Sequence, residues 1–85
     1  MITDDDALKH VSANLIRILE EQGRTAYWLM KAINMSPGAL YPIIRGEHLP
    51  SLGTAARIAE LLDVSVDELI KKPEKTGRKK LAKSA

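Results

Sequence analysis

The chain has 85 residues and no cysteine, which excludes a disulfide scaffold, a thiolate zinc site and a thiol nucleophile. This length suffices for one domain with one modest core. Two histidines without a cysteine make a structural metal site unexpected, and no apolar run approaches the roughly 20 residues of a membrane-spanning helix. We therefore expect one cytoplasmic domain without a cofactor, a metal ion or a membrane contact.

The net charge of +2 is unevenly distributed along the chain. Residues 71–85 carry seven Lys or Arg against one acid, a net charge of +6, so residues 1–70 carry −4. A basic end of this kind favours a polyanionic partner or is simply solvated, and both interpretations stay open. We predict a helical domain over residues 1–72 and a flexible, disordered basic tail over residues 73–85, which are too charged to fold alone.

Apolar residues at helical spacing predict a first helix from about Asp4 to Gln22. Thr3 is its N-cap, and the aspartates that follow lie where the helix dipole favours negative charge. The expected buried stripe is Leu8, Val11, Leu15, Ile18 and Leu19. Gly23 ends the helix as a C-cap residue.

Two short helices follow in close succession. Thr25 caps a second helix to about Ile33, where Asn34 in a left-handed conformation stops it. The expected inner face is Leu29, Ala32 and Ile33. Ser36 and Pro37 then form an N-cap and a first-turn proline, which open a third helix. Helices joined by so tight a turn form a helix-turn-helix.

Gly46 closes the third helix, and Ser51 caps a fourth. The apolar face of the fourth helix is Leu52, Ala55, Ala56, Ile58, Ala59, Leu61 and Leu62. Ser65 to Glu68 is a capping box that opens a short fifth helix ending near Ile70. The predicted fold class is therefore all-α, a compact bundle of four to five short helices without strands.

The segment from Asn14 to Ile70 resembles the Cro and lambda-repressor family of helix-turn-helix proteins. The resemblance rests on the order and spacing of Thr25, Leu29, Met35-Ser36, Leu40, Ile43, Arg45-Gly46, Pro50-Ser51-Leu52 and the run from Ile58 to Leu69. It implies a lambda-repressor-like domain of bacterial or phage type that binds double-stranded DNA as a homodimer. It also implies that the chain is not an enzyme.

The sequence departs from the family pattern at two places besides the base-reading positions. Ala26 stands where the family usually has a glutamine that grips a phosphate. Leu19 and Ile44 stand where the family often has a buried arginine and glutamate. Losing both charges together is physically coherent, because a buried pair can be replaced by apolar residues at little cost.

The third departure concerns the places where the family reads bases, which hold Pro37, Gly38, Ala39, Tyr41 and Pro42. Proline and glycine side chains offer no hydrogen bond to a base edge. Pro42 also lacks an amide hydrogen and clashes with the carbonyl of Gly38 in a regular helix, so we predict a kinked or loosened third helix. Tyr41 is the best base-contacting candidate, and its alternative role is to brace the kink.

Several polar residues around the motif suit phosphate contacts, although each has a structural alternative. Lys31, Arg45 and His48 are either phosphate ligands or solvated side chains. Ser36 and Ser51 are caps first and phosphate ligands second. The complete predicted DNA interface is Thr25, Ala26, Tyr27, Lys31, Ser36, Pro37, Gly38, Ala39, Tyr41, Pro42, Arg45, His48 and Ser51.

Two further surfaces are candidates for protein contacts. Tyr27 and Trp28 form an aromatic pair that, if exposed, indicates an interface with a protein or with DNA. The alternative is that Trp28 folds over the first helix. Val66, Leu69 and Ile70 form the predicted dimer interface on the fifth helix.

No arrangement of residues supports catalysis, because neither a Ser-His-Asp set nor a phosphate-cradling glycine loop is present. The sequence predicts a sequence-directed, repressor-like transcriptional regulator whose third helix enters the major groove. The alternative is a protein-interaction module on a helix-turn-helix fold that no longer reads DNA, such as an adaptor or an antitoxin-like protein.

Overall fold

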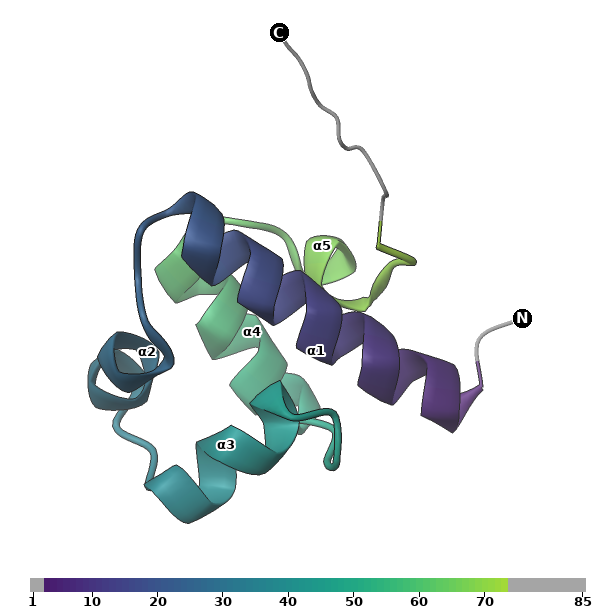
Figure 1. Ribbon diagram of the computed structural model, residues 1–85, viewed down its shortest axis with the longest axis horizontal. Coiled ribbons are helices and arrows are strands. Elements are labelled where there is room, and N and C mark those ends of the chain that lie inside the picture. Colours follow the sequence, from purple (N-terminus) through teal and green to yellow (C-terminus); the bar gives the residue numbers. More distant parts are fainter. Residues whose placement is uncertain (1–2, 74–85) are drawn as a thin grey trace, which may run out of the picture.

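The computed structural model describes residues 3–73, and most of these lie in five α-helices (Figure 1). The helices are α1 (Asp4–Glu21), α2 (Ala26–Ile33), α3 (Pro37–Ile44), α4 (Leu52–Leu62) and α5 (Val66–Ile70). The described residues contain no strand, so the predicted all-α bundle is confirmed. Of the predicted tail over residues 73–85, only Pro73 lies among the described residues.

Side-chain caps set the start of most helices. The Thr3 hydroxyl accepts from the Asp6 amide at 3.1 Å, and the Asp6 carboxylate accepts from the Thr3 amide at 3.4 Å. This is a complete capping box where the sequence predicted only the Thr3 cap. Ser65 accepts from the Glu68 amide, but the Glu68 carboxylate binds Lys71 Nζ at 3.2 Å. The capping box predicted for α5 is therefore only half formed.

The core is formed by apolar stripes from all five helices. Its members are Val11, Leu15, Ile18, Leu19, Leu29, Met30, Ile33, Leu40, Ile43, Ile58, Ala59, Leu62 and Leu69. Leu19 belongs to this cluster and Ile44 packs against it. Both positions thus have apolar surroundings, which suits the predicted replacement of a buried ion pair by apolar side chains.

Some predicted core positions are wrong. Ala32 is exposed and Met30 is buried in its place, because α2 turns positions 29, 30 and 33 inward. On α4 the buried stripe is Ala55, Ile58, Ala59 and Leu62, and Ala56 and Leu61 are exposed. Leu52 continues that stripe by sequence but is 81% exposed, because it is the first helical residue and lies beyond the packed part of the core.

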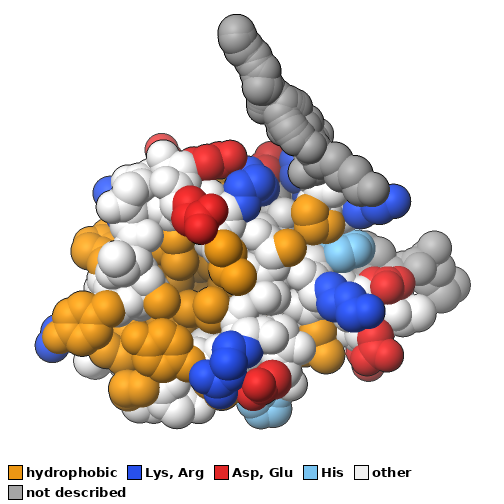
Figure 2. All heavy atoms as spheres, in the orientation of Figure 1, with side chains coloured by type: hydrophobic (Ala, Val, Ile, Leu, Met, Phe, Trp, Pro, Cys, Tyr) orange, Lys and Arg blue, Asp and Glu red, His pale blue; other side chains and the backbone are white. Residues whose placement is uncertain are grey.

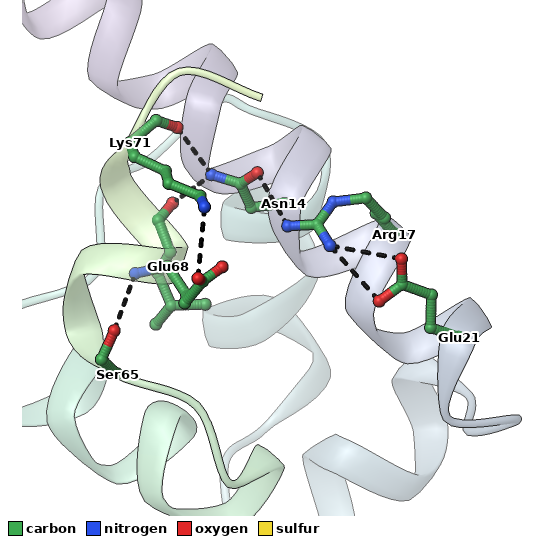
Figure 3. A network of polar contacts seen from close by, with 7 residues as sticks. Asn14, Arg17, Glu21, Ser65, Glu68 and Lys71 are labelled. Atoms are coloured by element: carbon green, nitrogen blue, oxygen red, sulfur yellow. Dashed lines mark hydrogen bonds and ion pairs between the residues drawn. The ribbon is translucent and has the colours of Figure 1, made fainter. Parts of the chain in front are cut away.

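A fully buried asparagine ties α5 to α1 (Figure 3). Asn14 Nδ2 donates to the carbonyl oxygens of Leu69 and Lys71, each at 2.9 Å. His10 Nδ1 lies 3.2 Å from the Ile70 carbonyl oxygen, one turn earlier on α1. Carbonyls at a helix end have no partner within the helix, so these side chains satisfy groups that would otherwise be unpaired.

Two more side chains close helix ends and fix neighbouring helices in place. Gln22 Nε2 donates to the Leu62 carbonyl at 2.6 Å, which joins the end of α1 to the end of α4. Arg57 on α4 donates to the Ile33 carbonyl at 2.7 Å, which joins α4 to the end of α2. The Arg57 contact holds α2 where the turn into α3 begins.

Candidate nucleic-acid interface

The helices α2 and α3 and the turn between them form the predicted helix-turn-helix. Asn34 ends α2 with φ 62°, and α3 begins at Pro37. Leu29 and Leu40 are fully buried and Met35 packs against the core, so both helices are held from behind. Figure 1 shows the two helices together on the side of the bundle away from α5. The outer side of α3 is therefore free to meet a partner.

The third helix continues through its internal proline. It runs from Pro37 to Ile44 with Pro42 inside, so the bond to the Gly38 carbonyl is the one that proline removes. A methyl group added at Gly38 would meet nothing within 4 Å, so this glycine is not needed to relieve crowding. The Pro42 carbonyl accepts the amides of Glu47 and His48, which closes the end of the helix. The predicted bend of the helix axis stays a prediction.

Most of the predicted DNA-contacting residues lie at the surface. All of them are exposed except Ala26, Tyr41 and Pro42, which are half-buried. Tyr41 packs against the core and still presents part of its side chain outward. This position allows it to brace α3 and to contact a partner at the same time.

The helix starts around the motif differ in how their hydroxyl groups are used. Thr25 accepts from the Trp28 amide at 3.0 Å and Ser51 accepts from the Thr54 amide at 3.1 Å, as predicted for caps. Ser36 makes no side-chain cap hydrogen bond, contrary to its predicted role. The start of α3 relies instead on Pro37, whose fixed φ suits the first helical position.

The cation at the end of α3 is held by its own neighbour. Arg45 Nε lies 3.1 Å from Glu47 Oε2, and Arg45 Nη2 lies 3.3 Å from Glu47 Oε1. These hydrogen bonds raise the pKa of the Arg45 guanidinium and lower the pKa of the Glu47 carboxyl. Both side chains are more than half exposed, so separating the Arg45–Glu47 pair costs little free energy. A phosphate would have to compete with Glu47 for Arg45.

The predicted aromatic pair does not behave as one exposed patch. Tyr27 is 60% exposed, with Lys31 Nζ 6.0 Å from its ring centroid. Trp28 is half-buried against the core, so of the two interpretations left open for it the structure favours the inward one. The guanidinium of Arg24 lies 4.0 Å from the Trp28 ring centroid. Sequence reasoning missed Arg24, because Arg24 precedes the N-cap Thr25 and its contact with Trp28 does not follow from helical spacing.

An apolar surface covers the end of the molecule formed by α2 and α3 (Figure 2). We define the α2–α3 surface as the outward parts of Tyr27, Pro37, Ala39, Tyr41 and Pro42. Of these, only the two tyrosines carry a hydrogen-bonding group. The α2–α3 surface is therefore mostly apolar, although it is the side predicted to meet DNA.

The predicted dimer residues on α5 differ in exposure. Leu69 is 1% exposed and belongs to the core, so its side chain is not accessible to a second copy. Val66 is half-buried against the same core. Ile70 is 39% exposed and is the member of the three best placed to meet a second copy.

Comparison with models of known protein families gave a match. The family model described as Helix-turn-helix matches residues 15–69, which is more than half of the chain. No curated protein and no solved structure matched. Within residues 3–73, no helix is long and apolar enough to cross a membrane, and no group of three or more His, Asp or Glu side chains could hold a metal ion.

Proposed function

The chain belongs to the Cro and lambda-repressor type of helix-turn-helix family of DNA-binding regulators, and from that premise we propose its specific role. It is a sequence-directed, repressor-like transcriptional regulator that reads double-stranded DNA with α3 in the major groove. The observation that carries this proposal is the placement of α3. Leu40 and Ile43 anchor it from behind, and Pro37, Gly38 and Ala39 face solvent.

Helix starts supply the phosphate contacts in this proposal. The exposed residues Thr25, Ser36 and Ser51 stand at the starts of α2, α3 and α4. A helix N-terminus presents free amides and the positive end of the helix dipole, both of which favour a phosphate. Such contacts position the protein on the duplex and carry no sequence information of their own.

Binding to DNA in this proposal requires positive charge from the basic end of the chain. Residues 74–85 hold five Lys or Arg and one acid, a net charge of +4, so residues 1–73 carry −2. The folded part therefore lacks the overall positive charge that usually drives binding to DNA. Lys31 and Arg45 supply local positive charge, and the residues after Pro73 supply the rest.

The proposed assembly is a weak symmetric dimer that DNA tightens. Ile70 provides the exposed apolar side chain of α5, and Val66 lies beside it on the same helix. A twofold symmetric interface is formed by the same patch on both copies, so each apolar side chain of α5 contributes to it twice. Two copies would present two α3 helices to successive major grooves of a palindromic site.

The α2–α3 surface favours a second candidate function, that of a protein-interaction module. Its apolar character and the net charge of −2 on residues 1–73 suit a protein partner better than they suit DNA. In that function the chain keeps its helix-turn-helix fold but acts as an adaptor or an antitoxin-like protein that binds its partner through Tyr27 and α3. The half-burial of Trp28 removes it from the centre of such an interface.

A binding selection of the full-length chain against random duplex DNA at moderate salt tests the proposal. We expect enrichment of a palindromic sequence, because two symmetric copies read two half-sites. Enrichment of one palindrome supports both the DNA reading and the dimer. Equal recovery of all sequences would contradict the proposal and favour the protein-interaction module.

A further inference from the structure

The exposed side of α3 has almost nothing with which to form a hydrogen bond. Residues 37–44 contain no charged, amide or serine side chain, and the hydroxyl of Tyr41 is their one polar side-chain group. Pro37, Gly38 and Ala39 are exposed in the first turn. Base recognition in the major groove ordinarily uses side chains that pair with donors and acceptors on base edges. This helix must use another property of the groove.

The first turn of α3 is also open to close approach. A methyl group added at Gly38 would meet nothing within 4 Å, so none of the other helices within residues 3–73 covers the backbone there. On either side of Gly38 stand the ring of Pro37 and the methyl group of Ala39. The result is a shallow apolar patch on the helix face that the proposed function directs into the groove.

The major groove has one common apolar feature, the methyl group on C5 of thymine. We propose that Pro37 and Ala39 determine specificity by contacting C5-methyl groups of pyrimidines, a proposal that rests on the proposed DNA-binding function. The methyl group of 5-methylcytosine occupies the same ring position. A patch without hydrogen-bonding groups cannot use the other edge atoms to separate the two bases. The DNA it selects carries a methylated pyrimidine, thymine or 5-methylcytosine, opposite the first turn of α3.

Deoxyuridine tests this directly, because it differs from thymidine only by lacking the C5 methyl group. The full-length chain is measured on its best selected duplex, with each thymidine replaced in turn by deoxyuridine. We expect affinity to fall about fourfold at each contacted position, the value of burying one carbon group. In a second series, a T·A pair at a contacted position is replaced by C·G or by 5-methylcytosine·G. The methylated pair should bind about fourfold more tightly than the unmethylated one.

Variants of α3 locate the contact. Ala39→Gly removes the contacting methyl group, so the difference between thymidine and deoxyuridine should vanish at one position. Pro37→Ala keeps Cβ and removes the rest of the ring, so it should reduce the same difference at a neighbouring position. Ala13→Gly makes the same change on an exposed part of α1 and should leave every ratio unchanged. Thermal unfolding of each variant checks that it is folded, and the wild-type series stands even where a variant is not.

The outcomes separate this inference from the proposed function. If one duplex is preferred and every deoxyuridine changes affinity by less than twofold, the methyl reading is wrong and the proposed function stands. If deoxyuridine weakens binding but neither Ala39→Gly nor Pro37→Ala alters the effect, the assignment to these residues is wrong. If no duplex is preferred over random DNA, the proposed function fails and the inference fails with it.

Discussion

The amide of Asn14 donates to the Leu69 carbonyl at 2.9 Å, in a position fully shielded from solvent. The same nitrogen also reaches the Lys71 carbonyl at 2.9 Å. On its other side, Asn14 Oδ1 accepts from Arg17 at 3.4 Å, and Arg17 pairs with Glu21 at 3.3 Å (Figure 3). One buried amide thus connects α1, the short helix α5 and the chain that leads toward the basic end.

Replacing Asn14 should destabilise the domain. Asn14→Ala leaves two carbonyl groups without their partner, and we expect a loss of about 1–3 kcal/mol in the free energy of unfolding. Chemical denaturation measures this loss. Glu20→Ala, an exposed change on the same helix, is the control and should stay within about 0.5 kcal/mol. A loss for Asn14→Ala no larger than the control would contradict the role given to this amide.

Substitution by alanine should stabilise the protein at two glycines and destabilise it at a third. Gly38 and Gly53 lie in helices and have nothing within 4 Å of an added methyl group. Alanine at either position should raise stability by about 0.5–1 kcal/mol. Gly46 has φ +80° and Ser12 Cβ at 3.4 Å from an added methyl group, so Gly46→Ala should lower stability. Thermal unfolding compares the three variants. An unchanged unfolding midpoint for Gly46→Ala would contradict the expected strain at this position.

The capping box at α1 should make stability sensitive to acid. Hydrogen bonds from Thr3 lower the pKa of Asp6. A carboxyl whose folded pKa is lowered stabilises the fold above its unfolded pKa, near 3.9, and that stability is lost as pH falls through the folded pKa. Asp6→Asn removes the titrating carboxyl, so it should lower the unfolding midpoint at pH 7 and reduce the fall of that midpoint below about pH 4. The same acid dependence in Asp6→Asn and wild type would contradict this.

The Arg45–Glu47 pair should limit DNA binding. Glu47→Gln frees the guanidinium and removes a negative charge, so affinity should rise and the log–log salt slope should steepen by up to about 0.9. Arg45→Ala should weaken all duplexes about equally. Glu21→Gln, which opens the comparable Arg17 pair on α1, is the matched control and should change neither quantity. Binding isotherms over a salt series provide the measurement. Tighter binding by Glu21→Gln would show that only net charge matters.

Features that depend on neighbouring residues could be predicted from sequence, whereas those that depend on packing could not. Thr25, Asn34 and Ser51 act within one helical turn, so their capping roles follow from residue type and spacing. Periodicity placed Leu69 on an apolar stripe but could not tell whether the core or a second copy would cover it. The deep burial of Leu69 follows from α5 packing on α1, which depends on Asn14, 55 residues away in sequence.

In the candidate site, too, some features follow from the sequence pattern and others depend on the folded chain. The exposure of Pro37 and Ala39 follows from the burial of Leu40 and Ile43 on the same helix, so helical period alone was sufficient. The pairing of Arg45 with Glu47 depends on how the chain turns after Gly46, where φ is +80°. Turn geometry of that kind is not contained in the periodic pattern.

The most direct test measures affinity for the selected duplex and for a scrambled duplex, using the full chain and a chain without residues 74–85. The account predicts that the truncation weakens binding to both duplexes by a similar factor and flattens the salt slope, because that segment supplies charge. The preference for the selected duplex should survive, since α3 supplies it. A preference that disappears with residues 74–85 would contradict the claim that α3 reads DNA.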